Sequence, residues 1–275
     1  MKFSLPSIFL TNARCIRNKI DEIVLKASEL SPDILIFCES WLGDAIPDDA
    51  IKIPGYTAFR NDRNVHGGGL ITYFANKLQV KVIEPQNIPS LASTVSEFSI
   101  FVLPDISLLL VVLYHPVWND SGEHERGLSC LLDIIDFVLT SHLDPCKARI
   151  VMCGDFIVQT QITGLKQIVN FPTRGKNTLD QIFTNISSVN SIRIFPPLGK
   201  SDHSCIFWSH DNVSLNRNVM KKTVRVMSKS NFCHFCSVIL GIDWMKYVSS
   251  FSDLNEAFAE FQMALKFLLD FCFPR

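Results

Sequence analysis

The stretch Ile34-Leu35-Ile36-Phe37-Cys38-Glu39 places five apolar residues in a row directly before a carboxylate. A run of this length, rich in branched and aromatic side chains, predicts a buried β-strand that ends at the acidic residue. The same kind of run recurs along the chain, at residues 7–10, 69–74, 108–113, 150–153, 181–184 and 204–208. The sequence therefore predicts many short buried strands.

Two segments between these runs, residues 18–30 and residues 127–139, repeat apolar side chains at helical spacing. Each has the single apolar stripe of a helix that covers a core. Because the expected strands outnumber the expected helices, two stacked sheets fit better than one doubly wound sheet. We therefore predict an α/β fold in which a two-sheet β-sandwich is flanked by helices.

The pattern changes after residue 208. Residues 211–230 are polar and basic and predict a linker, whereas residues 253–271 predict an amphipathic helix that packs on the domain or on a downstream partner. We accordingly expect a domain over residues 1–210, a linker over 211–230 and a helical extension over 231–275.

Charge and composition limit the classes of function. The 275 residues are 47% hydrophobic, enough for a large core, and 26 Lys and Arg against 27 Asp and Glu give a net charge of -1. A chain without an overall basic field must contact DNA through a local basic face or through bound cations. No run approaches the roughly 18 to 20 apolar residues of a membrane span, so no membrane contact is expected.

The nine cysteines are an odd number without the spacing of a disulfide framework, which predicts reduced thiols in an intracellular protein. Cys233 and Cys236 form one CxxC pair, but no second pair follows at zinc-finger distance, so a structural zinc site is not predicted.

Polar residues stand where the predicted strands end, and side chains at such positions converge on one edge of a fold. Taken singly, each fits a cap or a turn as well as a function. Glutamate and aspartate oxygens suit Mg²⁺ or Mn²⁺, and a histidine beside a carboxylate suits proton transfer. The candidates are Asn12, Glu39, Tyr114, Asp155, Asp180, Asp202 and His203.

In the order of its motifs and in their local sequences, the chain between about residues 7 and 208 resembles the endonuclease/exonuclease/phosphatase superfamily. More narrowly, it resembles the endonuclease of LINE-type (non-LTR) retrotransposons. The matching strings are Thr11-Asn12-Ala13-Arg14, Ile36-Phe37-Cys38-Glu39-Ser40-Trp41-Leu42, Phe59-Arg60-Asn61-Asp62-Arg63, Tyr114-His115-Pro116, Gly154-Asp155-Phe156, Phe171-Pro172-Thr173-Arg174, Thr178-Leu179-Asp180-Gln181-Ile182-Phe183 and Ser201-Asp202-His203-Ser204.

The resemblance implies a four-layer fold and a Mg²⁺- or Mn²⁺-dependent nuclease that nicks DNA, leaving a 3′-hydroxyl and a 5′-phosphate. Glu39 would hold the metal, with Asn12 and Asp202 completing its surroundings. Asp155 would orient or deprotonate the attacking water, and Tyr114 would contact the scissile phosphate. His203, polarised by Asp180, would stabilise the phosphorane or protonate it.

The resemblance also implies DNA as the partner, no small-molecule cofactor, and a location in the nucleus in preference to the cytoplasm. Residues 271–275 resemble the lead-in to a reverse transcriptase, which would make that domain a further partner.

Three weaker signals accompany these motifs. Arg60 and Arg63 are expected either to contact nucleic acid from a hairpin beside a phosphate groove or to stand in a structural turn with solvated charges. Trp41 suits stacking on a base, but a core position is the preferred interpretation.

The sequence departs from the family pattern after Asp155. Ile157 stands where the family has an asparagine, and the stretch up to Thr163-Gly164-Leu165 is shorter. Both departures predict impaired catalysis. Two alternatives therefore remain open. One is another superfamily activity, such as abasic-site repair or phosphoesterase work on RNA or lipids. The other is a catalytically silent nucleic-acid-binding or interaction module.

Overall fold

The structure is a computed structural model that describes residues 5–63, 67–84, 96–115, 143–144, 147–156, 165–187, 191–209 and 228–273. The chain divides into two compact units, residues 1–216 and residues 217–275. The expected helix over residues 127–139 and the departure at residue 157 lie outside the described residues.

One six-stranded sheet of the first unit has the order β11-β12-β1-β2-β4-β3. Its central strands β1 and β2 run parallel, and every other neighbouring pair in this sheet is antiparallel. Its strands are β1 (Ile8–Asn12), β2 (Ile34–Cys38), β3 (Tyr56–Asn61), β4 (Leu70–Ala75), β11 (Ser191–Phe195) and β12 (Cys205–Ser209).

The second six-stranded sheet has the order β5-β6-β7-β8-β10-β9. Here β7 and β8 form the central parallel pair, and their neighbours are antiparallel. Its strands are β5 (Lys81–Ile83), β6 (Glu97–Leu103), β7 (Leu108–Tyr114), β8 (Arg149–Asp155), β9 (Lys166–Gln167) and β10 (Asp180–Thr184).

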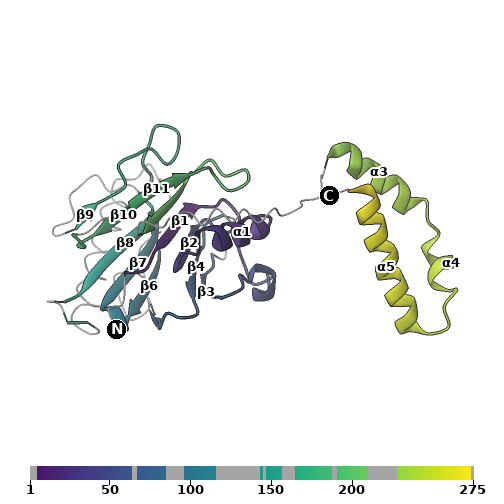
Figure 1. Ribbon diagram of the computed structural model, residues 1–275, viewed down its shortest axis with the longest axis horizontal. Coiled ribbons are helices and arrows are strands. Elements are labelled where there is room, and N and C mark those ends of the chain that lie inside the picture. Colours follow the sequence, from purple (N-terminus) through teal and green to yellow (C-terminus); the bar gives the residue numbers. More distant parts are fainter. Residues whose placement is uncertain are drawn as a thin grey trace. The chain divides into compact units, whose positions relative to one another are not determined.

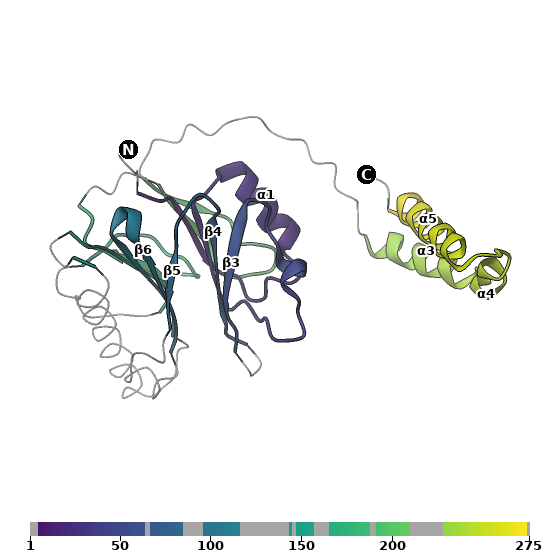
Figure 2. The same ribbon diagram turned by 90° about the horizontal axis from the view of Figure 1, so that it is seen from below.

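The two sheets stack face to face, as Figures 1 and 2 show. Side chains from both sheets, among them Leu10, Ile36, Leu110 and Val151, form one buried cluster between them. Helix α1 (Ile20–Leu30) covers the outer face of the first sheet, where it packs on β1 and β2. Two short 3-10 helices, η1 (Asp48–Ile51) and η4 (Pro104–Ile106), lie in connections. The predicted two-sheet fold is confirmed.

All seven predicted apolar runs are strands, but five strands were not predicted. β3, β5, β9 and β11 lie at or next to sheet edges, where half-exposed polar residues interrupt the apolar pattern. β6 alternates polar and apolar residues at its start, Glu97-Phe98-Ser99-Ile100, and so lacks a continuous run. Continuous apolar runs therefore identify only the strands that are buried on both faces.

The second unit contains three helices, α3 (Lys229–Leu240), α4 (Trp244–Val248) and α5 (Leu254–Cys272). Side chains of Ser228, Asp243 and Asp253 cap them by accepting backbone N–H bonds in the first turn. Helix α5 matches the helix expected over 253–271, whereas α3 includes the last two residues of the expected linker. Within the described residues, no helix combines the length and the hydrophobicity that a membrane span requires.

Candidate active site

The strand register brings the polar strand ends to one edge of the first unit. In the parallel pair β1–β2, Asn12 lies beside Cys38, which precedes Glu39, and in the parallel pair β7–β8, Tyr114 lies beside Asp155. The antiparallel strand β10 begins at Asp180, opposite Asp155. Carboxyl ends of parallel strands and the starts of their antiparallel neighbours therefore meet. Asn12, Glu39, Tyr114, Asp155, Asp180 and His203 are called the strand-end residues below.

Asn12 is fully buried and connects the acidic side chains. Its Nδ2 donates to Glu39 Oε1 at 2.8 Å and to Asp155 Oδ2 at 2.6 Å. Its backbone N–H donates to Asp180 Oδ1 at 3.1 Å, and its carbonyl accepts from Ser201 Oγ at 2.8 Å. One asparagine thus fixes three carboxylates that would otherwise repel one another.

Glu39 has both carboxylate oxygens engaged. Oε1 also accepts from the Tyr114 hydroxyl at 3.2 Å, and Oε2 accepts from Trp41 Nε1 at 3.1 Å. The expected core position of Trp41 is wrong, because 37% of this residue is exposed. Positive φ values of 52° at Glu39 and 50° at Trp41 turn the backbone sharply after β2, and this turn carries the indole out of the core.

His203 and Asp180 form a buried pair, in which His203 Nδ1 lies 2.7 Å from Asp180 Oδ2. Thr173 Oγ1 accepts the backbone N–H bonds of Leu179 and Asp180, which holds the start of β10 in place. Burial opposes the charged imidazole. The hydrogen bond and charge of Asp180, with the charge of Asp155, outweigh burial and raise the pKa of His203.

Asp155 lies next to this pair, with Oδ2 4.0 Å from His203 Nε2. Burial and the charge of Asp180 raise the pKa of Asp155 to about 6, although Asn12 and His203 act in the opposite direction. Its position depends on Gly154, since a Cβ there would overlap the carbonyl of Leu113 on β7 and φ is 149°. Close approach of β7 and β8 therefore sets where Asp155 stands.

Glu97, at the start of β6, is a carboxylate near the site that sequence reasoning missed. Its Oε2 accepts the Gly69 N–H at 2.6 Å, and Arg63 Nη1 lies 3.5 Å from Oε1. Burial raises the pKa of Glu97, and the charge of Glu39 adds to this. The alternation of polar and apolar residues over 97–100 was the available signal.

Asp202 is turned away from the hydrogen bonds that join the strand-end residues. Its Oδ1 lies 3.3 Å from Arg14 Nη1, and its Oδ2 accepts from Arg174 Nε at 2.7 Å. Neither arginine was given a role from the sequence, although both stand in the motif strings. Among the described residues, the side-chain contacts of Asp202 are with these two cations.

Arg60 and Arg63 are held by carboxylates. Arg60 donates to Asp48 and Asp62 and to the carbonyl of Ile46, and its side chain is only 18% exposed. Arg63 pairs with Glu97, as described above. These contacts favour the structural interpretation of the two arginines over nucleic-acid contact.

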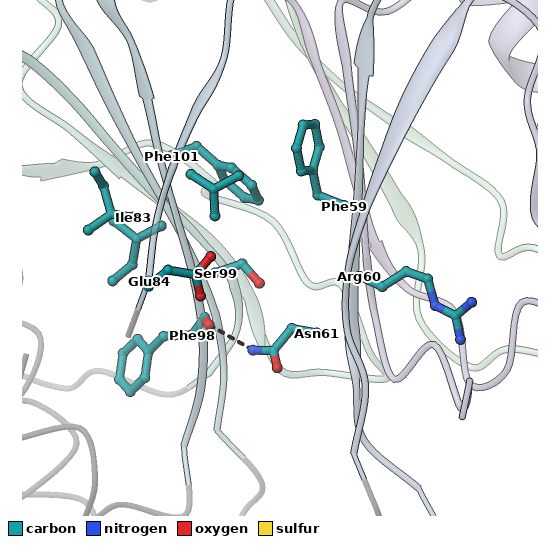
Figure 3. A pocket seen from close by; sticks show the side chains of 10 residues that line it. Phe59, Arg60, Asn61, Ile83, Glu84, Phe98, Ser99 and Phe101 are labelled. Atoms are coloured by element: carbon teal, nitrogen blue, oxygen red, sulfur yellow. Dashed lines mark hydrogen bonds between the residues drawn. The ribbon is translucent and has the colours of Figure 1, made fainter. Parts of the chain in front are cut away.

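A cavity of about 250 Å³ lies beside β3, between the two sheets. Figure 3 shows Phe59 and Asn61 directed toward β6 while Arg60 points the other way. Asn61 Nδ2 donates to the Phe98 carbonyl at 2.7 Å and so joins the sheets there. None of the strand-end residues lines this cavity, so it is separate from the candidate site.

The donor set fits a hard divalent cation. Among the described residues, no three His, Cys, Asp or Glu side chains are grouped as a metal cage. Mg²⁺ does not need such a cage, because it usually keeps several waters and binds one or two carboxylates together with substrate phosphate. Glu39 is half-buried and is joined through Asn12 to Asp155 and Asp180, so it is the residue that would hold the ion.

Comparison with known proteins identifies the fold. No family model matches the sequence, and no curated protein matches it. The 3′ phosphatase NExo from Neisseria, bound to a product DNA hairpin, is 12% identical over 75% of this chain and 100% of its own, with a TM-score of 0.57. TDP2 from C. elegans is 14% identical over 74% of this chain and 75% of its own, with a TM-score of 0.55.

An AP endonuclease from Archaeoglobus fulgidus is 14% identical over 75% of this chain and 100% of its own, with a TM-score of 0.54. Identities this low show a shared fold and no more, and in this chain that fold has two six-stranded sheets. The chain has the fold of the endonuclease/exonuclease/phosphatase superfamily, as the motif strings predict.

Proposed function

We propose that this chain is a Mg²⁺- or Mn²⁺-dependent phosphodiesterase that nicks DNA and leaves a 3′-hydroxyl and a 5′-phosphate. One observation carries the proposal: Asn12 joins Glu39 to Asp155 while the buried His203–Asp180 pair faces Asp155 from the other side. Asn12 thus joins a carboxylate for a cation to a base, and the histidine that would stabilise developing charge lies 4.0 Å from that base.

The chain's own groups have distinct roles. Water attacks phosphorus and gives its proton to Asp155, whose pKa of about 6 suits a base at neutral pH. Asp180 accepts from His203 Nδ1, which directs Nε2 toward the phosphate to stabilise the charge that develops. Tyr114 steadies Glu39 and contacts the phosphate. The bond to O3′ breaks, and O3′ takes a proton from solvent water, to which Asp155 afterwards returns the proton that it accepted. A bound Mg²⁺ or Mn²⁺ would neutralise charge on the phosphate oxygens.

The substrate is the part of the proposal that the neighbours leave open, since their names include a 3′ phosphatase and an AP endonuclease. End-labelled duplexes that are intact, abasic or 3′-phosphorylated separate these activities. We expect Mg²⁺-dependent cleavage of the intact duplex with 3′-hydroxyl and 5′-phosphate ends, abolished by a chelator. If only the abasic or only the 3′-phosphorylated duplex is turned over, abasic-site cleavage or 3′-phosphatase activity replaces nicking as the proposed function.

The LINE-type origin, a reverse transcriptase partner and a nuclear location belong to the same proposal and rest on the motif strings. If no substrate is cleaved but the parent binds DNA, the binding module is the better description. Asp155→Asn is the control variant in the cleavage experiment, because it keeps an oxygen that can accept from Asn12 and removes the base.

A further inference from the structure

Two arginines at the edge of the site have no part in the reaction described above. Arg14 Nη1 lies 3.3 Å from Asp202 Oδ1, and Arg174 Nε lies 2.7 Å from Asp202 Oδ2. The three side chains are 45%, 47% and 40% exposed, respectively for Arg14, Arg174 and Asp202. They therefore face solvent directly beside His203.

The backbones of both arginines are tied to the strand-end residues. The Arg14 N–H donates to Asn12 Oδ1 at 3.0 Å, and Lys19 Nζ donates to the Arg14 carbonyl at 3.0 Å. Arg174 stands in a tight turn whose N–H and carbonyl pair with Asn177, and the preceding Thr173 holds Asp180 through its hydroxyl. The backbone positions that carry the two guanidinium groups are thus fixed relative to Asn12 and Asp180.

The charges of this cluster do not cancel. Two guanidinium groups share one carboxylate, which leaves one net positive charge beside the acidic strand-end residues. In the described part of the chain each guanidinium donates one hydrogen bond, to Asp202. A guanidinium has five N–H donors in a planar fork that matches phosphate oxygens, so most of these donors face solvent.

A DNA strand approaching this edge meets repulsion from Glu39, Asp155 and Asp180, and the chain as a whole has a net charge of -1. Phosphate contacts fix the register of a protein on a duplex, and arginine supplies them most often in bidentate form. We propose that Arg14 and Arg174, held by Asp202, form a subsite for a DNA backbone phosphate next to the one that is cleaved. This inference rests on the proposed function.

The subsite changes the role expected of Asp202. Both of its oxygens face guanidinium groups, and a divalent cation at the same oxygens would be repelled by two positive charges. Asp202 is therefore a positioning residue for the arginine pair, and Glu39 is the carboxylate for the metal.

The test measures DNA binding without turnover, on the full chain in a chelator. Fluorescence anisotropy of a labelled duplex over a series of salt concentrations gives affinity and its salt dependence. Arg14→Gln and Arg174→Gln should each weaken binding by about tenfold at low salt, and each should reduce the slope of log K against log salt by about 0.9. Arg174→Lys should keep the slope but lose affinity, because the charge remains and the fork is lost.

Arg17→Gln is the matched control, since Arg17 lies three residues from Arg14 and contacts Cys15 in place of Asp202. It should keep the parental affinity and slope. A parental slope in the folded Arg14→Gln/Arg174→Gln double variant would overturn the subsite. The binding experiment needs no turnover. A parent that binds DNA through these arginines but never cleaves it would therefore contradict the proposed function and leave the subsite standing.

Calorimetry with Mg²⁺ tests the role of Asp202 separately. The Glu39→Gln variant should lose the binding heat of the parent, whereas Asp202→Asn should retain it. Loss of the heat in Asp202→Asn would make Asp202 a metal ligand and would contradict its assignment as the anchor of the arginine pair.

Discussion

Asp155 and Asp202 lie at the same edge of the fold, yet their surroundings shift their pKa values in opposite directions. Burial and Asp180 raise the pKa of Asp155 to about 6. Partial burial acts on Asp202 in the same sense, but its own backbone N–H and Arg174 outweigh burial and lower the pKa of Asp202. The edge therefore has a buried part suited to proton transfer and an exposed part suited to fixed charge.

Two consecutive residues mark the boundary between these parts. The His203 side chain is 1% exposed and faces Asp180, whereas the Asp202 side chain is 40% exposed and faces the arginines. Ser201 fixes this turn, because its hydroxyl donates to the Asn12 carbonyl and accepts the His203 N–H. Changes on the two sides should accordingly affect different quantities, catalytic rate on one side and binding on the other.

The largest effect is expected for His203→Ala. Loss of a positioned acid–base or electrostatic group should lower the single-turnover cleavage rate at saturating DNA by about 10³-fold. Arg174→Ala should instead raise the DNA concentration needed for half-maximal rate by about tenfold. Quench-flow measurements on both variants, with circular dichroism to check the fold, decide this. Equal losses of rate at saturation would erase the distinction between the two parts.

The next effect concerns stability. The folded chain holds the Asp155 proton more tightly than the unfolded chain, so the stability that this group contributes is fully present below a pH of about 4 and is lost as the pH rises through about 6. Asp155→Asn avoids this loss, and its free energy of unfolding in chelator should exceed that of the parent by about 3 kcal/mol at neutral pH. The gain should vanish near pH 4.

Urea denaturation at the two pH values measures this difference. Asp202→Asn is the control, because its lowered pKa means that the charged form is favoured in the folded chain, so this variant should gain no stability at neutral pH. A parent as stable as Asp155→Asn at neutral pH would mean that burial does not strain the Asp155 charge.

A smaller effect is expected at residue 157, which lies outside the described residues. The family that the motif strings resemble has an asparagine there, and one preorganised donor of this kind contributes about 10² to 10³ in rate. Ile157→Asn should therefore raise the single-turnover nicking rate by at least about tenfold at saturating Mg²⁺. No gain in a correctly folded variant would show that the shortened stretch after Phe156 keeps this side chain from the site.

Trp41→Phe should have the smallest effect. It removes the indole N–H that donates to Glu39 Oε2 and retains an aromatic side chain. Hydrogen-bond partners of a metal ligand set its orientation, and their loss weakens metal affinity by about tenfold at the lower end. Titration of the nicking rate with Mg²⁺ gives the apparent affinity. An unchanged titration would leave the Trp41 contact without a role at Glu39.

The fold and the strand-end residues follow from the sequence for a simple reason. In β2, an apolar run stops at Glu39, and such a stop is visible without any structure. Asn12 and Asp155 are strand ends of the same type. Glu97 escaped notice because polar and apolar residues alternate at the start of β6, so no run marks this strand.

Contacts between distant loops could not be predicted. Arg14 and Arg174 both contact Asp202. Arg14 does so from a backbone position with a φ of 41°, and Arg174 does so from the tight turn at Arg174–Asn177. Trp41 was assigned to the core on its residue type, but the positive φ values at Glu39 and Trp41 expose it. Backbone turns of this kind leave no periodic signal in a sequence.

The most direct test of the central claim is the single-turnover cleavage of an intact duplex by the full chain. We predict slow Mg²⁺-dependent nicking by the parent and by Arg17→Ala. No nicking should occur with chelator, and the rate of Asp155→Asn should be reduced by about 10³-fold. Nicking at the parental rate by Asp155→Asn, or nicking by the parent that continues in the presence of chelator, would contradict the account.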